Sequence, residues 1–395
     1  YKTTSNAHTL TGDGIGIVFR KGLPLEDMEF HQFHPTGLAG LGILISEAVR
    51  GEGGRLLNGE GERFMERYAP TIVDLAPRDI VARSMVLEVL EGRGAGPHKD
   101  YVYIDVRHLG EDVLEAKLPD ITEFARTYLG VDPVHELVPV YPTCHYVMGG
   151  VEVDADTGAA TVPGLFAAGE CSGGMHGSNR LGGNSLSDLL VFGRRAGLGA
   201  ADYVRALSSR PTVAEGALDA AAKRALSPFE APANGTPENP YTLQLELQQS
   251  MNDLVGIIRN ADEVAEALAR LDKLRERFKN LHVEGQRRYN PGWNLAIDLR
   301  NMLLVSECVA KAALQRTESR GGHTRDDHPA MDSSWRKVLL VCEAAGGDEV
   351  IPDITITKKE QTPMRPDLLE LFDIAELEKY YTDEELAGHP GRSGK

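Results

Sequence analysis

The spacing of apolar residues predicts helices and strands that alternate through the first half of the chain. Ile80, Leu87 and Leu90 recur at helical spacing after Pro77, and residues 113–129 keep the same period. Around these helices, short apolar runs bounded by glycine and proline are typical of strands. This half of the chain is therefore expected to mix helices with sheet.

Further short apolar runs follow residue 145. Residues 150–153 read as a short strand, and residues 162–169 read as a buried strand with Glu170 directly after it. A long helix is predicted to begin at Ser185, shortly after a pair of glycines. These boundaries place a glycine-rich loop between a strand and a helix.

The pattern changes after residue 212. Residues 213–316 contain few glycines and carry apolar residues at helical spacing, which predicts a small helical bundle. The tail offers strand-like runs at residues 338–341 and 351–356, followed by an acidic helix. The fold class predicted from these patterns is α/β, in several domains.

The composition argues against two classes of protein, those that bind nucleic acid and those that span a membrane. Across 395 residues, 42 Lys and Arg stand against 59 Asp and Glu, which leaves a net charge of −17 and no long basic run. A nucleic-acid-binding surface is therefore not expected. The longest apolar stretches are far shorter than the roughly 20 residues that a membrane-spanning helix needs, so no span is expected either.

The cysteines predict neither a metal site nor a disulfide framework. They are widely separated and form no C-x-x-C pair; they are Cys144, Cys171, Cys308 and Cys342. His31 and His34 could form a metal-binding pair, but no further ligands accompany them, so no metal site is predicted. Free cysteines of this kind fit a reducing compartment.

Three glycine-rich segments are candidates for cofactor contact. Residues 11–16 (TGDGIG) predict a turn that opens a helix, with the Asp13 carboxylate at its mouth. The third glycine comes one position too early for the G-x-G-x-x-G fingerprint, so a capped helix start is favoured. Glu170 ends the second segment, where a carboxylate can accept bonds from ribose or ribityl hydroxyls; an ordinary turn is equally consistent.

The third segment, residues 179–186 (NRLGGNSL), is the most specific. Two glycines allow a ligand to approach the backbone, and Ser185 begins a helix whose positive end would face that ligand. Anionic or carbonyl-rich groups, such as the pyrimidine edge of a reduced flavin, suit this end of a helix.

Several polar residues could grip a dicarboxylate. They are His34, Ser46, Glu47, Arg50, His145 and Arg180. Each also has a structural interpretation, because an isolated histidine is more often a structural hydrogen-bonding residue. Glu47 and Arg50, three residues apart, could likewise form a simple helical ion pair.

Arg78 occupies an unusual position. The sequence around it reads as a helix start with Pro77 at the first position. A cation there lies at the positive end of the helix dipole, which is unfavourable. Either Asp79 pairs locally with Arg78, or a site requires an arginine at this place.

The order of the motifs resembles that of one family. The chain carries, in sequence, residues 11–14 (TGDG), 32–37 (QFHPTG), 47–54 (EAVRGEGG), 61–70 (GERFMERYAP), 78–83 (RDIVAR), 143–146 (TCHY), 176–186 (HGSNRLGGNSL) and 317–323 (TESRGGH). This order and wording closely resemble the flavoprotein subunit of succinate dehydrogenase and fumarate reductase, over nearly the whole chain.

The resemblance implies a domain layout. A partial, Rossmann-like FAD-binding domain would occupy residues 1–28 and 146–212, interrupted by a capping domain at residues 29–145. A helical bundle domain at residues 213–333 and a small C-terminal domain at residues 334–395 would follow.

The resemblance also implies roles at matching positions. Arg78 matches the proton-transferring arginine, and Glu47 and Arg50 match the relay that joins it to solvent. Dicarboxylate binding is implied for His34, Ser46, His145 and Arg180, and contact with FAD for Asp13, Glu170, Ser185 and Leu186.

The implied activity is oxidation of succinate to fumarate, or the reverse, by hydride transfer to FAD. Electrons would pass to an iron–sulfur subunit and then to quinone, with membrane anchor subunits holding the complex indirectly. The chain would then lie peripherally on the cytoplasmic face of the cell membrane, or on the matrix face of the inner membrane if mitochondrial.

Two features depart from the family pattern. Ser46 stands where many relatives have threonine, which preserves the hydroxyl. The chain starts at Tyr1, and the G-x-G-x-x-G fold and the histidine that attaches flavin covalently are expected to lie outside it. This chain by itself is therefore not expected to hold FAD.

Two alternative functions stay open. L-aspartate oxidase shares the implied fold, although residues 144–150 and 180–183 are closer in wording to the succinate and fumarate branch. A non-catalytic fragment acting in assembly or binding is the other alternative. The residues whose implied role is purely catalytic are all present, which favours an enzyme over a non-catalytic fragment.

Overall fold

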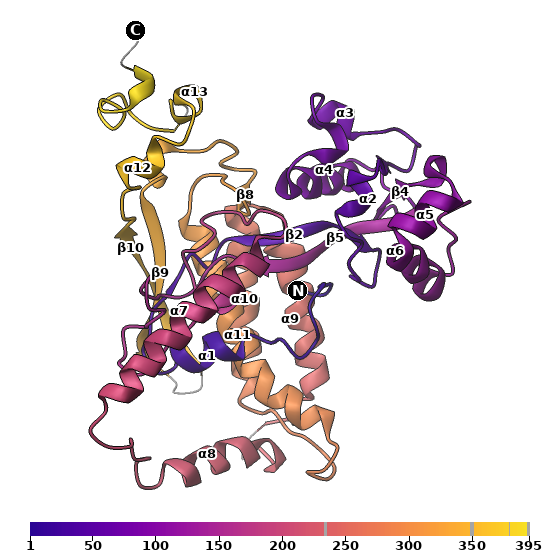
Figure 1. Cartoon of the computed structure of the whole chain (residues 1–395). Coiled ribbons are helices and arrows are strands. Elements are labelled where there is room, and N and C mark those ends of the chain that lie inside the picture. Colours follow the sequence, from indigo (N-terminus) through magenta and orange to yellow (C-terminus); the bar gives the residue numbers. More distant parts are fainter. Residues whose placement is uncertain (233–234, 348–350, 379, 393–395) are drawn as a thin grey trace.

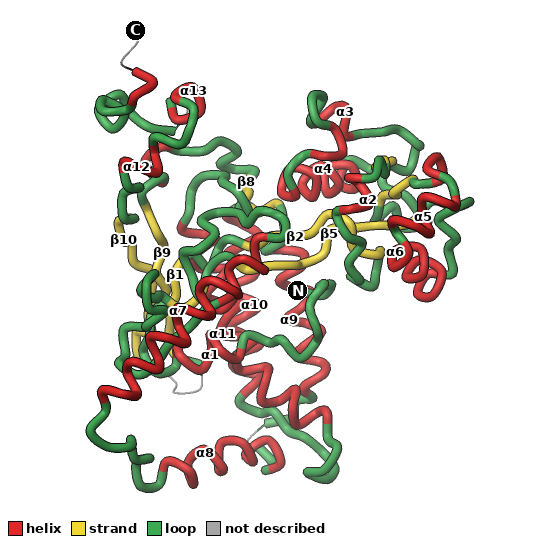
Figure 2. The backbone as a smooth tube through the Cα atoms, viewed as in Figure 1, coloured by secondary structure: helices red, strands yellow, loops and turns green. Residues whose placement is uncertain are grey.

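The computed structural model packs helices around small, mainly antiparallel sheets (Figures 1 and 2). It describes residues 1–232, 235–347, 351–378 and 380–392. The first sheet has the strand order β2-β5-β4-β3 and is antiparallel throughout. Its strands are β2 His31–Leu38, β3 Arg55–Leu57, β4 Val102–Asp105 and β5 Val138–Val147.

The second sheet joins the tail of the chain to its beginning. Its order is β10-β9-β1-β6, again antiparallel, and its strands are β1 Leu25–Glu26, β6 Gly150–Val151, β9 Val338–Gly347 and β10 Pro352–Glu360. A short parallel pair, β7 Ile258–Arg259 with β8 Thr324–Arg325, completes the sheets of the described residues. The strand-like tail is therefore confirmed.

Helices precede, follow and cover these sheets. They are α1 Asp13–Phe19, α2 Ala48–Gly51, α3 Met65–Tyr68, α4 Arg78–Leu90, α5 Glu111–Lys117, α6 Pro119–Phe124, α7 Asn184–Ala206, α8 Ala217–Leu226, α9 Pro240–Leu254, α10 Ala261–Phe278, α11 Pro291–Gln315, α12 Pro366–Leu369 and α13 Ile374–Leu377. The mixture of helix and sheet in several parts confirms the α/β, multi-domain fold class. The domain boundaries given above stay a prediction.

Two separate hydrophobic cores organise the chain. One is built from α1, α9, α10 and α11 with strands of the second sheet. The other lies in the lobe that contains α2 to α6, and its members include Leu38, Val138 and Val140 at one end of β2 and β5. In Figure 1 these two long strands run from the helical body into the lobe. Residues midway along them therefore lie at the junction of the two cores.

A bulge interrupts the pairing of β2 and β5 at this junction. His34 pairs with Thr143, but the register shifts before Gly37 pairs with Tyr141. Pro35 lies inside the shift and has no N–H to donate to a ladder. Bulges of this kind redirect side chains and are common beside active sites.

Most of the predicted helices are present. The helix after Pro77 is α4, although Pro77 is its N-cap residue rather than its first residue. The long helix predicted from Ser185 is α7, which begins one residue earlier. Residues 213–316 contain α8 to α11, as the glycine-poor pattern predicted.

The turn at residues 11–16 opens α1, as favoured. Gly12 is its N-cap residue, with φ +80 in the left-handed region, where glycine is least strained. No side chain caps this helix, so the expectation of a capped start is only partly correct. Thr11 instead donates a hydrogen bond to the Asp13 carboxylate at 3.3 Å.

The buried strand predicted at residues 162–169 does not form. The segment pairs only through an isolated bridge between Phe166 and Ala159. Gly164 and Gly169 have φ of +91 and +76, and such left-handed residues turn the chain out of the extended conformation that a strand needs. The left-handed conformation of Gly164 and Gly169 therefore explains why no strand forms in this segment.

An ion-pair network lies between the helical core and the second sheet. Arg316 follows α11, and its guanidinium donates to Glu29 at 2.6 Å and to Glu318 at 3.0 Å. All three side chains are at most 1% exposed. Arg316 also stacks on Phe30 and Trp335, with distances of 4.7 and 5.1 Å to the ring centroids. The Arg316 guanidinium therefore neutralises two buried carboxylates, Glu29 and Glu318, from different segments of the chain.

Replacing the cation tests how far the fold depends on it. We predict that Arg316→Met lowers the free energy of unfolding by about 3–5 kcal/mol, because Glu29 stays buried without its partner. Urea denaturation followed by circular dichroism measures the change. Arg270→Met, which breaks an exposed helical ion pair with Glu266, is the control and should have far less effect. An equal effect of both changes would contradict the account.

Candidate active site

Two histidines face each other on neighbouring strands at the junction of the cores. His34 on β2 and His145 on β5 have ring centroids 5.3 Å apart, in an edge-to-face arrangement. Burial, together with the positive charge of Arg78, lowers the pKa of His34 to about 2 and that of His145 to about 4. Both rings are therefore neutral near pH 7 and can donate a hydrogen bond without carrying charge.

Three arginines surround these rings. Arg78 is the first residue of α4, Arg50 belongs to α2, and Arg180 lies in the loop before α7. The charges of Arg78 and Arg180 contribute to the lowered pKa of both histidines. We call the assembled residues the histidine–arginine cluster: Gln32, His34, Glu47, Arg50, Arg78, His145 and Arg180.

Glu47 binds two of the arginines at once. Its Oε2 accepts from Arg78 Nη2 and its Oε1 from Arg50 Nη2, both at 2.9 Å. Burial of this carboxylate opposes its ionisation. The hydrogen bond and the positive charge of Arg78, together with those of Arg50, have a larger effect than burial and lower the pKa of Glu47. The predicted pairing of Glu47 with Arg50 is confirmed. The local pairing of Arg78 with Asp79 is wrong, since Asp79 accepts instead from Asn179 at 3.0 Å.

Gln32 bridges the other pair of arginines. Its Oε1 accepts from Arg78 Nη1 at 3.2 Å and from Arg180 Nη2 at 3.1 Å. Its Nε2 donates to the Asn179 side chain at 2.7 Å and to the Arg180 carbonyl at 2.6 Å. One buried amide thus holds two cations side by side in spite of their mutual repulsion.

Arg180 is anchored by an aromatic ring and keeps one unused donor. Its guanidinium lies 4.4 Å from the Tyr146 ring centroid, a cation–π contact. The Tyr146 hydroxyl donates to Asp188 at 3.3 Å and lies 3.2 Å from His176 Nε2. Arg180 Nε is buried and has no hydrogen-bond partner in the described residues. A bound acceptor would satisfy it.

The glycine pair before α7 lies directly against the cluster. A Cβ at Gly182 would lie 2.6 Å from Glu47 Oε2 and 3.2 Å from Arg78 Nη2. Only a residue without a side chain can let the backbone approach this closely. Gly182 therefore lies close to the Glu47–Arg78 pair, and the approach of a ligand to the two glycines stays a prediction.

The cluster carries an excess of positive charge. Three guanidinium groups and one carboxylate leave a formal charge of +2, since both histidines are neutral. Burial, and then repulsion from Arg78, lowers the pKa of Arg180. A ligand with two negative charges would balance the excess charge of the cluster and reduce the repulsion between Arg78 and Arg180.

Ser46 lies beside the cluster but is not joined to it. Its hydroxyl accepts from the Ala48 N–H at 3.3 Å, at the start of α2, and the residue is exposed. No contact in the described residues connects Ser46 with the histidines or with Arg180. Its role in substrate binding stays a prediction.

The residues predicted to contact FAD lie in two places. Ser185 and Leu186 are in the first turn of α7, a helix of 23 residues whose N-terminus has no side-chain cap. The positive end of this helix suits a carbonyl-rich ring edge, although the Leu186 N–H already donates to the Gly183 carbonyl at 3.1 Å, and the Leu186 side chain, 67% exposed, suits a flat apolar face. These residues therefore fit a flavin.

The other two candidates lie on separate elements. Glu170 is in a single 3-10 turn that packs against α7, and its carboxylate accepts from the Val147 N–H at 3.0 Å. Asp13 begins α1 and accepts a hydrogen bond from Asn301 on α11. The structure brings Glu170 close to the α7 terminus but leaves Asp13 apart from it, and all four roles stay predictions.

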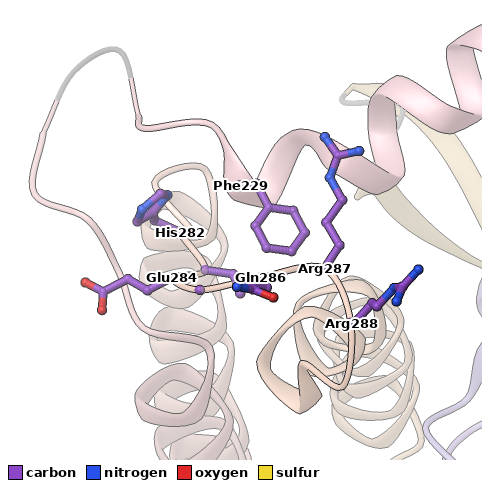
Figure 3. Close-up of a pocket in the computed structure, with 8 residues that line it drawn as sticks. Phe229, His282, Glu284, Gln286, Arg287 and Arg288 are labelled. Carbon is purple, nitrogen blue, oxygen red and sulfur yellow. The ribbon is translucent and has the colours of Figure 1, made fainter.

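A cleft in the helical region lacks converging polar groups. It has a volume of about 740 Å³ and is lined by Phe229 and residues 282–288. In Figure 3 the charged side chains of Glu284 and Arg287 point away from each other, and none of the lining residues belongs to the histidine–arginine cluster. We therefore place the candidate site at the cluster.

Two kinds of feature are absent from the described residues: a group of metal ligands and a membrane-spanning helix. No group of three or more His, Cys, Asp or Glu side chains in the described ranges is arranged to hold a metal ion. None of the helices in that part of the chain combines the length and apolar composition of a bilayer crossing.

Sequence reasoning missed two residues of this site. Gln32 lies two residues before His34, and on a strand that spacing places side chains on the same face, which was the available signal. Ser5 contacts His145 across 140 positions, with 2.6 Å between Ser5 Oγ and His145 Nδ1. No local pattern in the sequence indicates a contact of that separation.

Comparisons with known proteins identify the family. The family model described as FAD binding domain matches residues 1–186, and the one described as fumarate reductase flavoprotein C-term matches residues 244–367. Together they cover both the cluster and the helical region.

Named relatives agree with these matches. The succinate dehydrogenase flavoprotein subunit of Coxiella burnetii is 46% identical over 349 residues, which are 85% of this chain and 59% of that protein. The fumarate reductase flavoprotein subunit of a Serratia species is 43% identical over 343 residues, 83% of this chain and 56% of that protein. The chain thus spans less than two thirds of the length of these curated relatives.

Solved structures give the same result. The Mycobacterium smegmatis Sdh1 complex in the apo form contains a chain with a TM-score of 0.85 and 59% identity, covering 99% of this chain and 64% of that one. The chain belongs to the family of flavoprotein subunits of succinate dehydrogenase and fumarate reductase.

Proposed function

We propose that this chain provides the dicarboxylate site and the proton-transferring residues of a flavoprotein subunit that interconverts succinate and fumarate. The observation that carries the proposal is the histidine–arginine cluster: two neutral histidine donors and a net charge of +2 at one place. Succinate and fumarate are dianions of matching charge.

Substrate binding falls to Arg180 and the two histidines. The planar guanidinium of Arg180 is held by Gln32 and Tyr146, so it is already oriented before a carboxylate arrives. His34 and His145 can donate to carboxylate oxygens from the strands beside it. A dicarboxylate bound in this way is fixed in position and direction, which lowers the entropy cost of reaction.

The cofactor supplies the redox chemistry. FAD would supply the acceptor for a hydride from one methylene carbon of succinate. Ser185 and Leu186 would hold the flavin at the N-terminus of α7, close in sequence to Gly182, which approaches the Glu47–Arg78 pair.

Arg78 would accept the proton that leaves the second methylene carbon of succinate. Its guanidinium is 11% exposed and bonds Glu47, whose side chain is 42% exposed. Arg50, at 1% exposed, holds the other oxygen of Glu47 and is itself fixed by the Asp74 carbonyl at 2.6 Å. Arg78 would first pass a proton to Glu47 and on to water, and the neutral guanidine would then accept the proton from the second carbon; fumarate reduction would use the same route in reverse.

Partners and location follow from the proposed activity. Electrons would leave through an iron–sulfur subunit to a quinone, and anchor subunits would hold the assembly peripherally at the membrane, on its cytoplasmic or matrix face. Structures of neighbours support a quinone, because one is the M. smegmatis Sdh1 in complex with UQ1 and another is a quinol-fumarate reductase with menaquinol.

L-aspartate oxidation is the second candidate and is less well supported. Aspartate carries an ammonium group, which requires an acceptor that is free. The carboxylate within the cluster, Glu47, is already bonded to Arg50 and Arg78. The remaining excess of cations would repel the ammonium group.

We predict that Arg78→Lys lowers succinate turnover by at least about 100-fold, since proton transfer contributes that much or more. Binding of malonate, a non-reacting dicarboxylate, should change little because Arg180 and the histidines remain. Stopped-flow turnover and malonate titration of the complete subunit in its complex measure the two effects. Arg83→Lys, on the same helix, is the matched control. Turnover near the wild-type rate in Arg78→Lys would refute the assignment.

We predict the opposite division for Arg180→Met. Loss of a charged, bidentate donor should weaken malonate binding by roughly 10- to 100-fold. Isothermal titration calorimetry measures the dissociation constant directly. An unchanged constant would mean that Arg180 does not bind the dicarboxylate.

Substrate choice separates the two candidate enzymes. The complete complex should reduce a quinone with succinate and show no activity with L-aspartate. Activity with aspartate alone would overturn the proposed function in favour of the oxidase.

A further inference from the structure

We infer that Ser5 is a positioning residue for His145: its hydroxyl fixes the imidazole in the tautomer that donates from Nε2 into the dicarboxylate site. The inference rests on the proposed function, because it concerns how the same site binds a carboxylate. It adds a residue to which no sequence motif assigned a role.

The distances around Ser5 decide the direction of the hydrogen bond. Ser5 Oγ lies 2.6 Å from His145 Nδ1 and 3.4 Å from the Cys144 carbonyl oxygen. The second distance is outside the usual range for O–H···O bonds, so the single hydroxyl proton points to Nδ1. Nδ1 is then the acceptor, and a neutral ring must carry its proton on Nε2.

His34 reaches the same tautomer by another route. Its Nδ1 accepts from the Thr36 backbone N–H at 3.3 Å, while the Thr36 hydroxyl donates to the Ile45 carbonyl at 2.7 Å. A backbone N–H can only donate, so the proton of His34 also lies on Nε2. Nε2 of neither ring makes a hydrogen bond in the described part of the chain. The site therefore presents two neutral donors with free N–H groups.

The two histidines differ in how they can be disturbed. The backbone donor to His34 cannot be removed by a side-chain substitution, whereas the donor to His145 is a single hydroxyl. Ser5 is thus the position at which the tautomer of one ring can be changed while the chemistry of the other residues is left intact.

Backbone bonds place Ser5 independently of the ring that it contacts. The Ser5 N–H donates to the Cys144 carbonyl at 3.0 Å, and the Cys144 N–H donates to the Thr3 carbonyl at 3.2 Å. On the other side, Gly42 comes so close that a Cβ there would lie 2.8 Å from the Thr4 carbonyl oxygen. The segment is therefore fixed between β5 and the loop at Gly42.

Removing the hydroxyl should weaken binding of a dicarboxylate while the ring stays neutral. Without Ser5 Oγ, the neutral ring can place its proton on Nδ1, and the Nε2 lone pair then repels a substrate carboxylate. Burial and the charge of Arg78 lower the pKa of His145 to about 4, so the ring is neutral at both pH 6 and pH 8 and the defect should be equal at the two pH values. The charged and titratable groups around His145 are Arg78, Arg180, Glu47, His34 and Cys144.

The test uses the complete subunit in its complex and malonate as the probe. For Ser5→Ala, the malonate dissociation constant should rise roughly tenfold at both pH 6 and pH 8. Ser5→Thr retains the hydroxyl and should bind as the wild type does. Thr3→Ala removes another side-chain hydroxyl from the same segment and should also leave binding unchanged.

Each outcome decides the matter. Equal affinity of Ser5→Ala and wild type at both pH values would overturn the inference, as would failure of Ser5→Thr to restore binding. A loss of the same size in Thr3→Ala would point to packing of the segment and would also overturn it. If Ser5→Ala does not fold, Ser5→Cys, which keeps the size but is a weak donor, should show the same loss of malonate affinity. If the wild type itself neither binds malonate nor oxidises succinate, the proposed function fails instead.

Discussion

The site depends on holding three buried or half-buried arginines together. Cations at this spacing repel one another, and burial adds a further cost, so each guanidinium needs acceptors that keep it in place. Glu47 supplies them to Arg50 and Arg78, and Gln32 supplies them to Arg78 and Arg180. The neutral state of both histidines completes the balance, because a charged ring would add to the repulsion. What remains is an excess of positive charge that fits a dianion.

The fold places this cluster where two cores meet. Strands β2 and β5 are each anchored at one end in the lobe core, and the bulge at Pro35 lies midway between the cores. The bulge leaves the Thr36 N–H free to bind His34 rather than a neighbouring strand. Rigid strands set the histidines, and helix starts and loops bring the arginines to them, so several elements must assemble before the site exists.

Sequence reasoning recovered the local parts of this arrangement and missed the long-range ones. The Glu47–Arg50 pair and the placement of Arg78 at a helix start depend on spacings of a few residues, and both are present. Spacing alone could not pair Arg78 with Glu47, which lies 31 positions away, and only the family resemblance connected the two. Ser5 was missed because its contact with His145 spans 140 positions. Gln32 was missed although its spacing from His34 was an available signal, and the strand at residues 162–169 failed because glycines there adopt left-handed φ. The roles of Ser46, Asp13 and Glu170 stay predictions.

A structure of the complete subunit with malonate bound would test the central claim most directly. The account predicts one malonate carboxylate within hydrogen-bond distance of the Arg180 guanidinium and of Nε2 of His34 or His145. It also predicts that Gln32 and Glu47 keep their bonds to the arginines. Malonate bound away from these side chains, for example in the cleft lined by residues 282–288, would contradict the account.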